Sequence, residues 1–385
     1  MGEPVILEAL RAPVGRRNGA FRERRPEEVY GEVLKTLVSK VGIDPVKIED
    51  VPTGCVTEVG PQGGNVGRMA VLAAGFPVTV PAVTMNRACG SAQQAVHFAS
   101  QAIAAGDMKY AIGGGVEFMS QVGMGADMTL NGEFNVNFDL FQKFDMISMG
   151  EAGERIAEKY KFSRRELDEF AFTSQSRAAN ATKSGYFKSQ IVPMQGLDKA
   201  GNAFTLDFDE GIRMEPDLEK MLSLPPSFRP DGVVTAGNSS QISDGTGAVL
   251  VADRETAIAD GFKPRARFRA RVVVGGDPSI QLLEVIPATR KALERSGLSL
   301  DDIGVIEINE AFASVVLAWA RELNPDMERV NPNGGAIAHG HPLGGTGAIL
   351  MSKLLHEMER RDVQFGLQVM CIGGGMSTCT ILERI

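Results

Sequence analysis

Long apolar runs, paired cysteines and an excess of basic residues are all missing from this chain. Its 385 residues hold four cysteines and four histidines, with no CxxC spacing, so neither a disulfide framework nor a structural metal site such as zinc is supported. No apolar run approaches the roughly 20 residues of a membrane-spanning helix. The net charge of −8, without a lysine–arginine block, argues against a nucleic-acid partner. The first residues also lack a signal-peptide layout, so we expect a soluble, cytoplasmic protein.

Glycine, in contrast, is abundant. The 44 glycines gather in short clusters, which favours tight turns and close approach of the backbone to a ligand rather than a flexible linker. The share of charged residues, 23%, is ordinary for a globular protein and does not indicate disorder. At this length we expect two domains or one duplicated domain.

Strands and helices are expected to alternate in the first part of the chain. Apolar runs rich in β-branched residues predict strands, and apolar positions at helical spacing predict helices. The predicted strands cover residues 4–9, 51–56 and 82–86, the last of them buried, and the predicted helices cover residues 26–41, 63–74 and 91–105. This alternation predicts an α/β fold in which helices cover a mostly parallel sheet.

The C-terminal part of the chain resembles a faint copy of the first part. The spacing of apolar residues between Gly42 and Val51 recurs between Gly297 and Ile306, and each set is expected to close a helix and enter a strand. In a second match, residues 111–115 and 371–375 each place three glycines at the end of a predicted strand. These two matches leave internal duplication open, because both could arise by chance.

The middle of the chain, residues 119–241, has a different composition. It is rich in methionine, charged residues and helix formers. A helix is predicted over residues 163–184, because Ser163 followed by Glu166 is the signature of an N-terminal capping box. We expect this segment to be an insertion that folds over one face of the core.

Cys89 is a candidate nucleophile. It follows the predicted strand over residues 82–86 and stands at the first turn of the next predicted helix, where unpaired N–H groups and the helix dipole stabilise a thiolate. We therefore expect a lowered thiol pKa. Gly90 and Ser91 are small enough to let a bulky substrate approach the sulfur. A buried structural cysteine is the alternative interpretation.

Residues 334–348 form the most unusual run in the chain, with His339 and His341 set among glycines. A thiolate nucleophile usually needs a base nearby, and these histidines are candidates. Pro342 suits the first turn of a helix, which would place His341 at the cap of that helix. One alternative is a pair of metal ligands, which the absence of nearby carboxylates or thiols argues against. The other is a simple glycine-rich turn.

Asn309 and Cys371 are each expected at the end of a strand. A side-chain amide in the position of Asn309 commonly orients a ligand or a water, although it could also cap a helix. Cys371 precedes Gly373–Gly375, which leave neighbouring N–H groups accessible, and a structural role is its alternative. The chain contains neither GxxxxGK[ST] nor a GxGxxG in the context of a dinucleotide-binding unit, so a nucleotide phosphate loop is not supported.

Taken together, these segments resemble the thiolase family over nearly the whole chain and in the order of that family. The segments that carry the resemblance are residues 11–16, 86–91, 114–117, 235–240, 309–313, 340–342 and 371–375. The resemblance implies a thiolase fold, that is, a duplicated five-layer α/β/α/β/α core. It implies an N-terminal half of residues 1–118 plus 242–263, an inserted lid (loop) domain of residues 119–241, and a C-terminal half of residues 264–385.

The resemblance also assigns roles. Cys89 would be acylated, His341 would take its proton, and Cys371 would act as acid and base at the α-carbon of acetyl-CoA. Asn309, through a held water, and His341 would form one oxyanion hole, and the backbone N–H groups of Cys89 and Gly373 would form the other. Two carbonyl groups are polarised in turn, so two sets of preorganised donors are needed.

The implied reaction is CoA-dependent thiolytic cleavage of a 3-oxoacyl-CoA to acetyl-CoA and a shortened acyl-CoA, as in β-oxidation. Coenzyme A would be a co-substrate, with no covalently bound cofactor and no metal. Ser240 resembles the residue that contacts the pantetheine arm, and Arg213 and Phe228 resemble residues that line the CoA site. Residues 62–68 resemble the segment near the family's dimer interface, so a homodimer or homotetramer is expected.

Some positions depart from the short-chain, acetoacetyl-CoA pattern of the family. Ser148 stands where those members carry a histidine, the stretch over residues 119–149 is short, and Gln241 follows Ser240 as in degradative members; these features favour a longer acyl chain. Ser377 stands where glycine is common. A biosynthetic acetoacetyl-CoA thiolase stays open as an alternative. A ketosynthase would carry a second histidine in place of Cys371, and a non-catalytic acyl- or lipid-binding relative would be expected to lose catalytic residues.

Overall fold

Two sheets that meet along a short join between β1 and β11 organise the computed structural model, which describes residues 2–385. The first sheet runs in the order β4 (Val83–Met85), β3 (Pro52–Gly54), β5 (Tyr110–Phe118), β10 (Ser243–Asp253) and β1 (Pro4–Arg11), with β2 (Gly15–Arg16) against β10. The second runs in the order β11 (Ala266–Gly275), β14 (Met376–Arg384), β13 (Phe365–Ile372) and β12 (Val305–Ile308). Each sheet belongs to one half of the chain.

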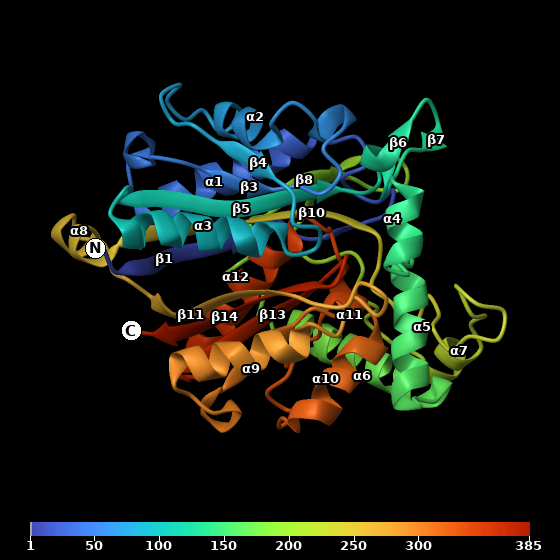
Figure 1. Ribbon diagram of the computed structural model, residues 1–385. Helices are drawn as coiled ribbons and strands as arrows, with labels where there is room; N and C mark the ends of the chain where they lie inside the picture. The colour runs from blue at the N-terminus through green and yellow to red at the C-terminus, as the bar shows by residue number, and fades with distance from the viewer. Residues whose placement is uncertain (1) are drawn as a thin grey trace.

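Helices separate and cover the two sheets, which gives five layers (Figure 1). The outer layers are α1 (Pro26–Val41) with α2 (Val66–Ala73), and α9 (Val285–Ser296) with α10 (Ala313–Leu323). The middle layer holds α3 (Ser91–Ala105) and α12 (Thr346–Arg360), and α12 contacts both sheets. Residues 346–358 of α12 are all buried, as expected of a helix with sheet on both sides. The small helices α8 (Arg254–Ala259) and α11 (Ala336–His339) complete the two halves.

The sheets are mixed, so the prediction of a mostly parallel sheet is wrong. Among the strands of residues 2–385, only β3–β4, β3–β5 and β12–β13 pair in parallel, whereas β10 lies antiparallel to both β5 and β1. The reason is topological. β10 follows the insertion and returns beside β5, whereas β13 and β14 form a hairpin. Neither connection is the helical crossover that a parallel pair requires.

The duplication suggested by the sequence has a structural basis in one of the two matches. Gly42 and Gly297 both end a helix with positive φ, and each is followed by a short 3₁₀ helix (Pro45–Lys47 or Leu300–Asp302) and then a strand. The second match is wrong, because Gly113–Gly115 lie within β5 rather than at its end. At Gly115 a side chain would collide with the carbonyl oxygen of Gly344, so glycine here permits close packing.

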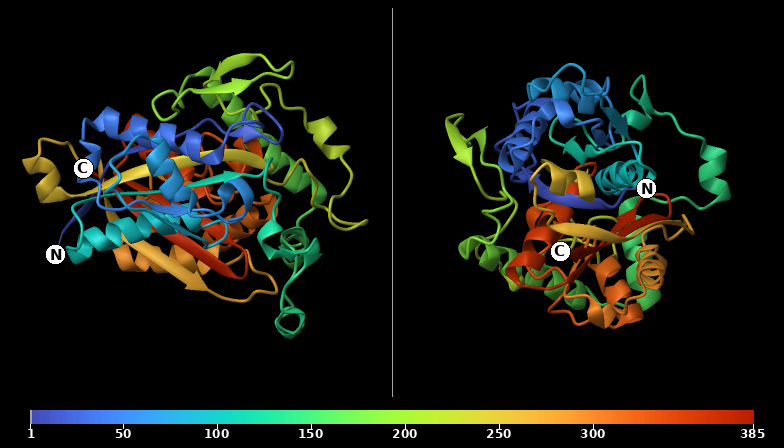
Figure 2. Two further views of the ribbon diagram at one scale, coloured as in Figure 1. Left: turned by 90° about the horizontal axis from the view of Figure 1, so that it is seen from above. Right: turned by 90° about the vertical axis from the view of Figure 1, so that its left-hand side faces the viewer.

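The insertion, residues 119–241, wraps around the end of the core opposite the two termini (Figures 1 and 2). Its elements are a 3₁₀ turn (Ala126–Met128), β6 (Thr129–Leu130), β7 (Glu133–Phe134), α4 (Phe138–Lys143), α5 (Met149–Tyr160), α6 (Arg164–Lys183), β8 (Met194–Leu197), β9 (Ala203–Leu206) and α7 (Leu218–Leu222). The predicted capping box of Ser163 and Glu166 is present at the start of α6. Figure 2 shows the β8–β9 hairpin and α4 on opposite sides of the core.

The strand over residues 82–86 was expected to be buried, and this prediction is wrong. Within residues 2–385, β4 pairs only with β3 and forms an edge of the first sheet, and Val83 is 46% exposed. The predicted helix over residues 63–74 begins later, at Val66, with Asn65 as its N-cap and a 3₁₀ turn (Gly60–Gln62) before it. Within residues 2–385, no helix is long and apolar enough to cross a bilayer.

A buried ion pair fastens the insertion to β1. Arg11 donates two hydrogen bonds to the carboxylate of Asp209, at 2.6 and 3.0 Å, and both side chains are fully buried. The same carboxylate accepts the N–H of Val14 at 2.8 Å. Residues at the end of the insertion are therefore held against the strand that enters the core.

We expect Arg11→Met to destabilise the protein by about 3–5 kcal/mol, because it leaves the carboxylate of Asp209 buried without its cation. Arg165→Met, which removes an exposed pair with Glu169, is the matched control and should cost less than about 1 kcal/mol. Thermal unfolding followed by circular dichroism provides the measurement. Equal shifts for the two variants would contradict the expectation.

Candidate active site

Cys89 lies in a tight turn between β4 and α3. Ala88 has a φ of 42°, a conformation that costs energy for any residue other than glycine. The N–H groups of Gly90 and Ser91 donate to the carbonyls of Arg87 and Ala88, at 3.1 and 3.0 Å. Helix α3 begins at Ser91 with Gly90 as its N-cap, so Cys89 precedes the helix instead of standing in its first turn.

The prediction of a lowered thiol pKa is wrong for the resting protein. Burial raises the pKa of Cys89 to about 12, with a further contribution from the neighbouring Cys371. The backbone N–H groups of Gly373 and of Cys89 itself act in the opposite direction and lower this pKa, because N–H donors near the sulfur favour the thiolate. The side chain is 8% exposed, so desolvation of the thiolate outweighs these donors. Cys89 is therefore a neutral thiol until a base removes its proton.

His341 is a suitable base. Its Nδ1 lies 2.7 Å from the hydroxyl of Thr346, and that hydroxyl donates its own proton to the carbonyl of Pro342 at 2.8 Å. The hydroxyl must consequently accept from Nδ1–H, which leaves the lone pair on Nε2. Burial lowers the pKa of His341 to about 4, so the ring is neutral at physiological pH.

The His341 loop is held by two side chains for which the sequence predicted no such contact, the buried Glu117 and the partly buried Gln241. Glu117, at the end of β5, accepts the N–H of Gly344 at 2.9 Å. The side-chain amide of Gln241 donates to the backbone carbonyls of Gly211, Ile337 and Ala338. The backbone carbonyl of Gln241 accepts the N–H of His341 at 3.0 Å. The expected helix cap at His341 is absent, because α12 begins only at Thr346.

Glu117 also accepts hydrogen bonds from its own half of the protein, the half that carries the nucleophile. Its carboxylate accepts the N–H groups of Val56 and Thr57, at 2.8 and 3.2 Å, and the side-chain amide of Gln62 at 2.8 Å. Burial raises the pKa of Glu117, and these donors oppose that rise. Glu117 belongs to the motif over residues 114–117, near the end of a strand that is buried along its whole length. This position was the signal in the sequence that could have indicated a role for Glu117.

Asn309 and Cys371 lie together beside His341. The side-chain nitrogen of Asn309 is 3.4 Å from His341 Nε2 and 3.5 Å from the sulfur of Cys371. Burial raises the pKa of Cys371, whereas Asn309 and the N–H of Ala311 lower it. Asn309 does not cap a helix, since α10 begins at Ala313. Its Oδ1 is buried without a hydrogen-bond partner among the described residues, which fits a held water or substrate.

His339, the other candidate histidine, belongs to a separate cluster. Its Nε2 accepts from the ammonium of Lys353 at 3.3 Å, and Lys353 also pairs with Glu307 at 2.9 Å. Its Nδ1 lies 3.0 Å from the carbonyl of Gly340. Both ring nitrogens of His339 are thus used in packing, and the structure leaves His341 as the base.

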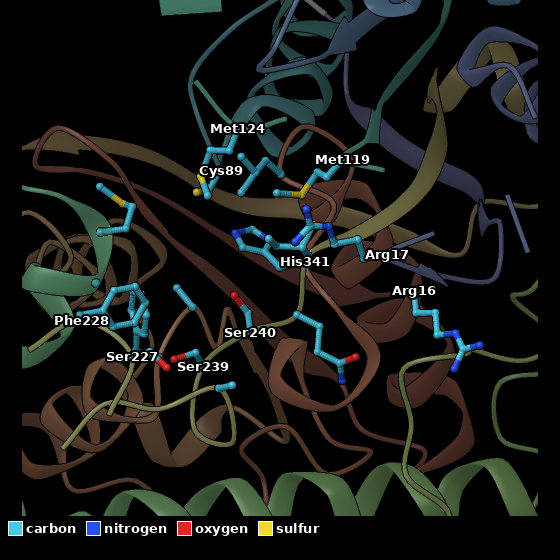
Figure 3. Close-up of a pocket in the computed structure, with 18 of the residues that line it drawn as sticks. Arg16, Arg17, Cys89, Met119, Met124, Ser227, Phe228, Ser239, Ser240 and His341 are labelled. Carbon is cyan, nitrogen blue, oxygen red and sulfur yellow. The ribbon is translucent and has the colours of Figure 1, made fainter. Parts of the chain in front are cut away.

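A cavity of about 610 Å³ opens onto the nucleophile and the base. Figure 3 shows Cys89 and His341 pointing into it, with Phe228 and Ser240 on the opposite wall. Arg213 also lines it, as do Arg16, Arg17, Met119, Met124, Met149, Leu282 and Leu343. Asn309, Cys371 and Gly373 do not line it. Ser148 is exposed and caps α5, so the adjacent Met149 is the residue that faces the cavity.

The cavity therefore combines an apolar floor with a thiol, an imidazole and three arginines. Within residues 2–385, no group of three or more histidine, cysteine, aspartate or glutamate side chains could hold a metal ion. A neutral thiol beside a neutral imidazole can be acylated by a bound carbonyl or thioester. The second thiol, Cys371, lies behind the cavity wall, 3.5 Å from the side-chain nitrogen of Asn309.

Comparison with known proteins identifies the family. The family model of the thiolase N-terminal domain matches residues 4–255, and that of the thiolase C-terminal domain matches residues 262–384. The chain belongs to the thiolase family. It is 42% identical to the steroid 3-ketoacyl-CoA thiolase of Mycobacterium tuberculosis, over the whole chain and 95% of that protein. It is 44% identical to the 3-ketoacyl-CoA thiolase of Yersinia pestis, over the full length of both.

A solved structure agrees with this family. The crystal structure of the Bacillus anthracis acetyl-CoA acetyltransferase superposes with a TM-score of 0.91 at 36% identity, over the whole chain and 99% of that structure. The predicted thiolase fold, with its duplicated five-layer core, is confirmed. As a thiolase, the chain acts on CoA thioesters as an acyltransferase.

We expect alkylation of Cys89 by iodoacetamide to accelerate about tenfold per pH unit from pH 6 to pH 9, because the thiol pKa of about 12 lies above this range and only the thiolate reacts. Mass spectrometry of the Cys89 peptide measures the rate, and Cys89→Ala provides the blank. Cys55, Cys371 and Cys379 should stay unmodified in the folded protein, because they are fully buried. A plateau near pH 7 would instead indicate a preformed thiolate.

Proposed function

We propose that the chain is a degradative 3-ketoacyl-CoA thiolase, which uses CoA to cleave a 3-oxoacyl-CoA into acetyl-CoA and a shortened acyl-CoA. The observation that carries the proposal is the meeting of His341 and Cys371 at one side-chain amide, that of Asn309, beside a cavity that Cys89 and His341 both line. One thiol and one base suffice for acyl transfer alone. The second thiol beside them supports carbon–carbon cleavage, which needs a proton at the α-carbon.

In the first half-reaction, His341 Nε2 takes the proton of Cys89, and the sulfur attacks the 3-oxo carbon. In this proposal the backbone N–H groups of Cys89 and Gly373, which favour the thiolate of Cys89, stabilise the resulting oxyanion. The C2–C3 bond then breaks, and its electron pair passes into the enolate of acetyl-CoA. Protonated His341 and Asn309, through a held water, stabilise the enolate oxygen, while Cys371 donates its proton to C2.

In the second half-reaction, the thiolate of Cys371 takes the proton of an incoming CoA thiol. The CoA sulfur attacks the thioester on Cys89, the bond between that thioester carbon and the sulfur of Cys89 breaks, and His341 returns the proton to Cys89. Every proton and electron pair is then restored. The covalent intermediate gives ping-pong kinetics, with acetyl-CoA leaving before the second CoA reacts.

The position of CoA follows from the charges around the cavity. Arg213, Arg16 and Arg17 are exposed side chains that line it, and they supply the cations that a CoA phosphate requires. Ser240 and Phe228 line the wall toward which we place the pantetheine arm (Figure 3). The sequence indicated Arg213, Ser240 and Phe228. The contribution of Arg16 and Arg17, which lie in the arginine-rich opening segment, was missed.

The acyl chain is proposed to be longer than that of acetoacetyl-CoA. Met119, Met124 and Leu343 line the cavity together with Cys89, and such flexible apolar side chains suit an acyl tail of variable shape. The relatives named 3-ketoacyl-CoA thiolase support this choice over the short-chain alternative. The insertion supplies Met119, Met124 and Met149 to the cavity, so we assign residues 119–241 as the lid domain of the two-halved core.

We expect the chain to cleave 3-oxoacyl-CoA substrates with activity that rises from four carbons toward longer chains, measured as loss of the magnesium–enolate absorbance. Cys89→Ala should reduce kcat by at least about 1,000-fold. Cys371→Ala should lose cleavage yet still transfer an acyl group, at a reduced rate, between acyl-CoA and free CoA, because in this exchange His341 can give the departing CoA thiolate the proton that it took from Cys89. Cys379→Ala, a buried cysteine away from the cavity, is the matched control.

Activity confined to acetoacetyl-CoA would establish the short-chain alternative. Tight CoA binding without cleavage of any substrate would favour a non-catalytic acyl-binding protein. Cleavage that survives in Cys89→Ala would refute the assigned nucleophile.

We also propose a cytoplasmic homodimer, or a homotetramer built from two such dimers. All four cysteines are free, and thiol chemistry at Cys89 requires a reducing compartment. The edge strand β4 exposes Val83, and Val78, Met69 and Leu72 are exposed on the neighbouring α2 region. An unpaired edge beside apolar side chains is suited to pairing with a second copy.

We expect light scattering on a sizing column to give at least twice the mass of one chain. Val83→Lys should shift the population toward single chains, because it places a charge in the proposed interface. Ile258→Lys, at an apolar position on α8 that is 56% exposed against 46% for Val83, is the control. A single-chain mass for the unmodified protein would contradict the proposed dimer.

A further inference from the structure

A buried amide joins the glycine turn of residues 373–375 to the insertion. Gln281 lies in the loop between β11 and α9 and is 3% exposed. Its Oε1 accepts the N–H of Gly374 at 2.6 Å, and its Nε2 donates to the carbonyl of Ile147 at 2.7 Å. Both ends of the amide are therefore used, and they bind two segments that are far apart in the sequence.

The glycine turn needs an external support. It connects β13 to β14, and Gly374 and Gly375 have φ values of 80° and 75°. Glycine adopts this conformation readily, but it brings no side chain that could fix the peptide planes. Gly276 donates to the carbonyl of Gly375 at 2.7 Å, and Gln281 holds Gly374. The N–H of Gly373, next to the supported peptide, is one of the donors that lower the pKa of the Cys89 thiol.

The other end of the amide lies beside the cavity. Ile147 precedes Ser148, the N-cap of α5, and Met149 begins that helix. Met149 lines the cavity, and its methyl group would lie 3.2 Å from a Cβ at Gly373, so the two residues are in contact. Residues 147–149 therefore reach the glycine turn twice, through Gln281 and through Met149.

We propose that Gln281 is a positioning residue, which directs the Gly373 N–H at the reacting carbon's oxygen while residues 147–149 of the insertion are in place. This role rests on the proposed thiolase function. An acyl group that fills the cavity presses on Met149, and Met149 borders the same turn. Gln281 thereby links the position of the insertion to the alignment of an oxyanion donor.

Arg155 offers a matched comparison. It donates to the carbonyl of Ser279 at 3.1 Å and to the carboxylate of Asp145 at 2.5 Å. It thus joins the insertion to the same loop as Gln281 does, yet it makes no hydrogen bond to the glycine turn. Loss of Arg155 loosens the insertion without releasing Gly374.

The test compares Gln281→Met, of similar length, with Arg155→Met. We expect Gln281→Met to lower kcat by about 10- to 100-fold, less than the removal of a whole oxyanion donor, with KM for CoA within about twofold. Alkylation of Cys89 by iodoacetamide at pH 8 should slow about three- to tenfold, because the Gly373 N–H helps to lower the thiol pKa. Arg155→Met should change each of these values less than about twofold.

Equal losses in both variants, or an unchanged kcat and alkylation rate in Gln281→Met, would overturn the proposal. Should Gln281→Met fail to fold, as judged by circular dichroism, Gln281→Asn carries the same test, because its shorter amide cannot span both contacts. The alkylation rate requires no substrate. If the chain cleaved no 3-oxoacyl-CoA, the proposed function would fail, and the alkylation comparison would still decide whether Gln281 orients Gly373.

Discussion

The buried carboxylate of Glu117 is the contact on which the geometry of the active site depends. It belongs to the sheet of the N-terminal half, which also carries the nucleophile, yet one of its oxygens accepts the N–H of Gly344 in the other half. Gly344 is part of the loop that presents His341. A single buried acceptor with four N–H donors thus sets the base opposite the thiol across the junction of two duplicated units.

The three side chains that react at this junction, those of Cys89, His341 and Cys371, are uncharged in the resting protein. Burial opposes the thiolates of Cys89 and Cys371 and the imidazolium of His341 alike. The site therefore avoids the desolvation cost of a permanent buried ion pair. Charge arises only when a substrate carbonyl offers an oxygen to donors that are already oriented, which concentrates their effect on the transition state.

The sequence predicted features that depend on a few neighbouring residues. The ends of α1 and α3 and the capping box at Ser163 follow from contacts within one or two helical turns, and the catalytic set followed from resemblance to a family. Strand direction and the pKa of Cys89 were predicted wrongly, because both depend on segments that meet only in the folded chain. For the same reason the hydrogen bonds by which Glu117, Gln241 and Gln281 hold the active-site loops were not predicted, since their partners lie far away in the sequence.

The antiparallel return of β10 beside β5 has an evolutionary consequence. Phe118 and Asp244 are direct partners across these strands, so the whole insertion leaves and re-enters the core at adjacent points. In this respect it is an enlarged hairpin loop, and doubling the length of such a loop costs only about 0.6 kcal/mol. Residues can be gained, lost or exchanged there without a change of strand register. The fold thus separates a fixed reaction chemistry from a replaceable module, through which substrate range can diversify among descendants.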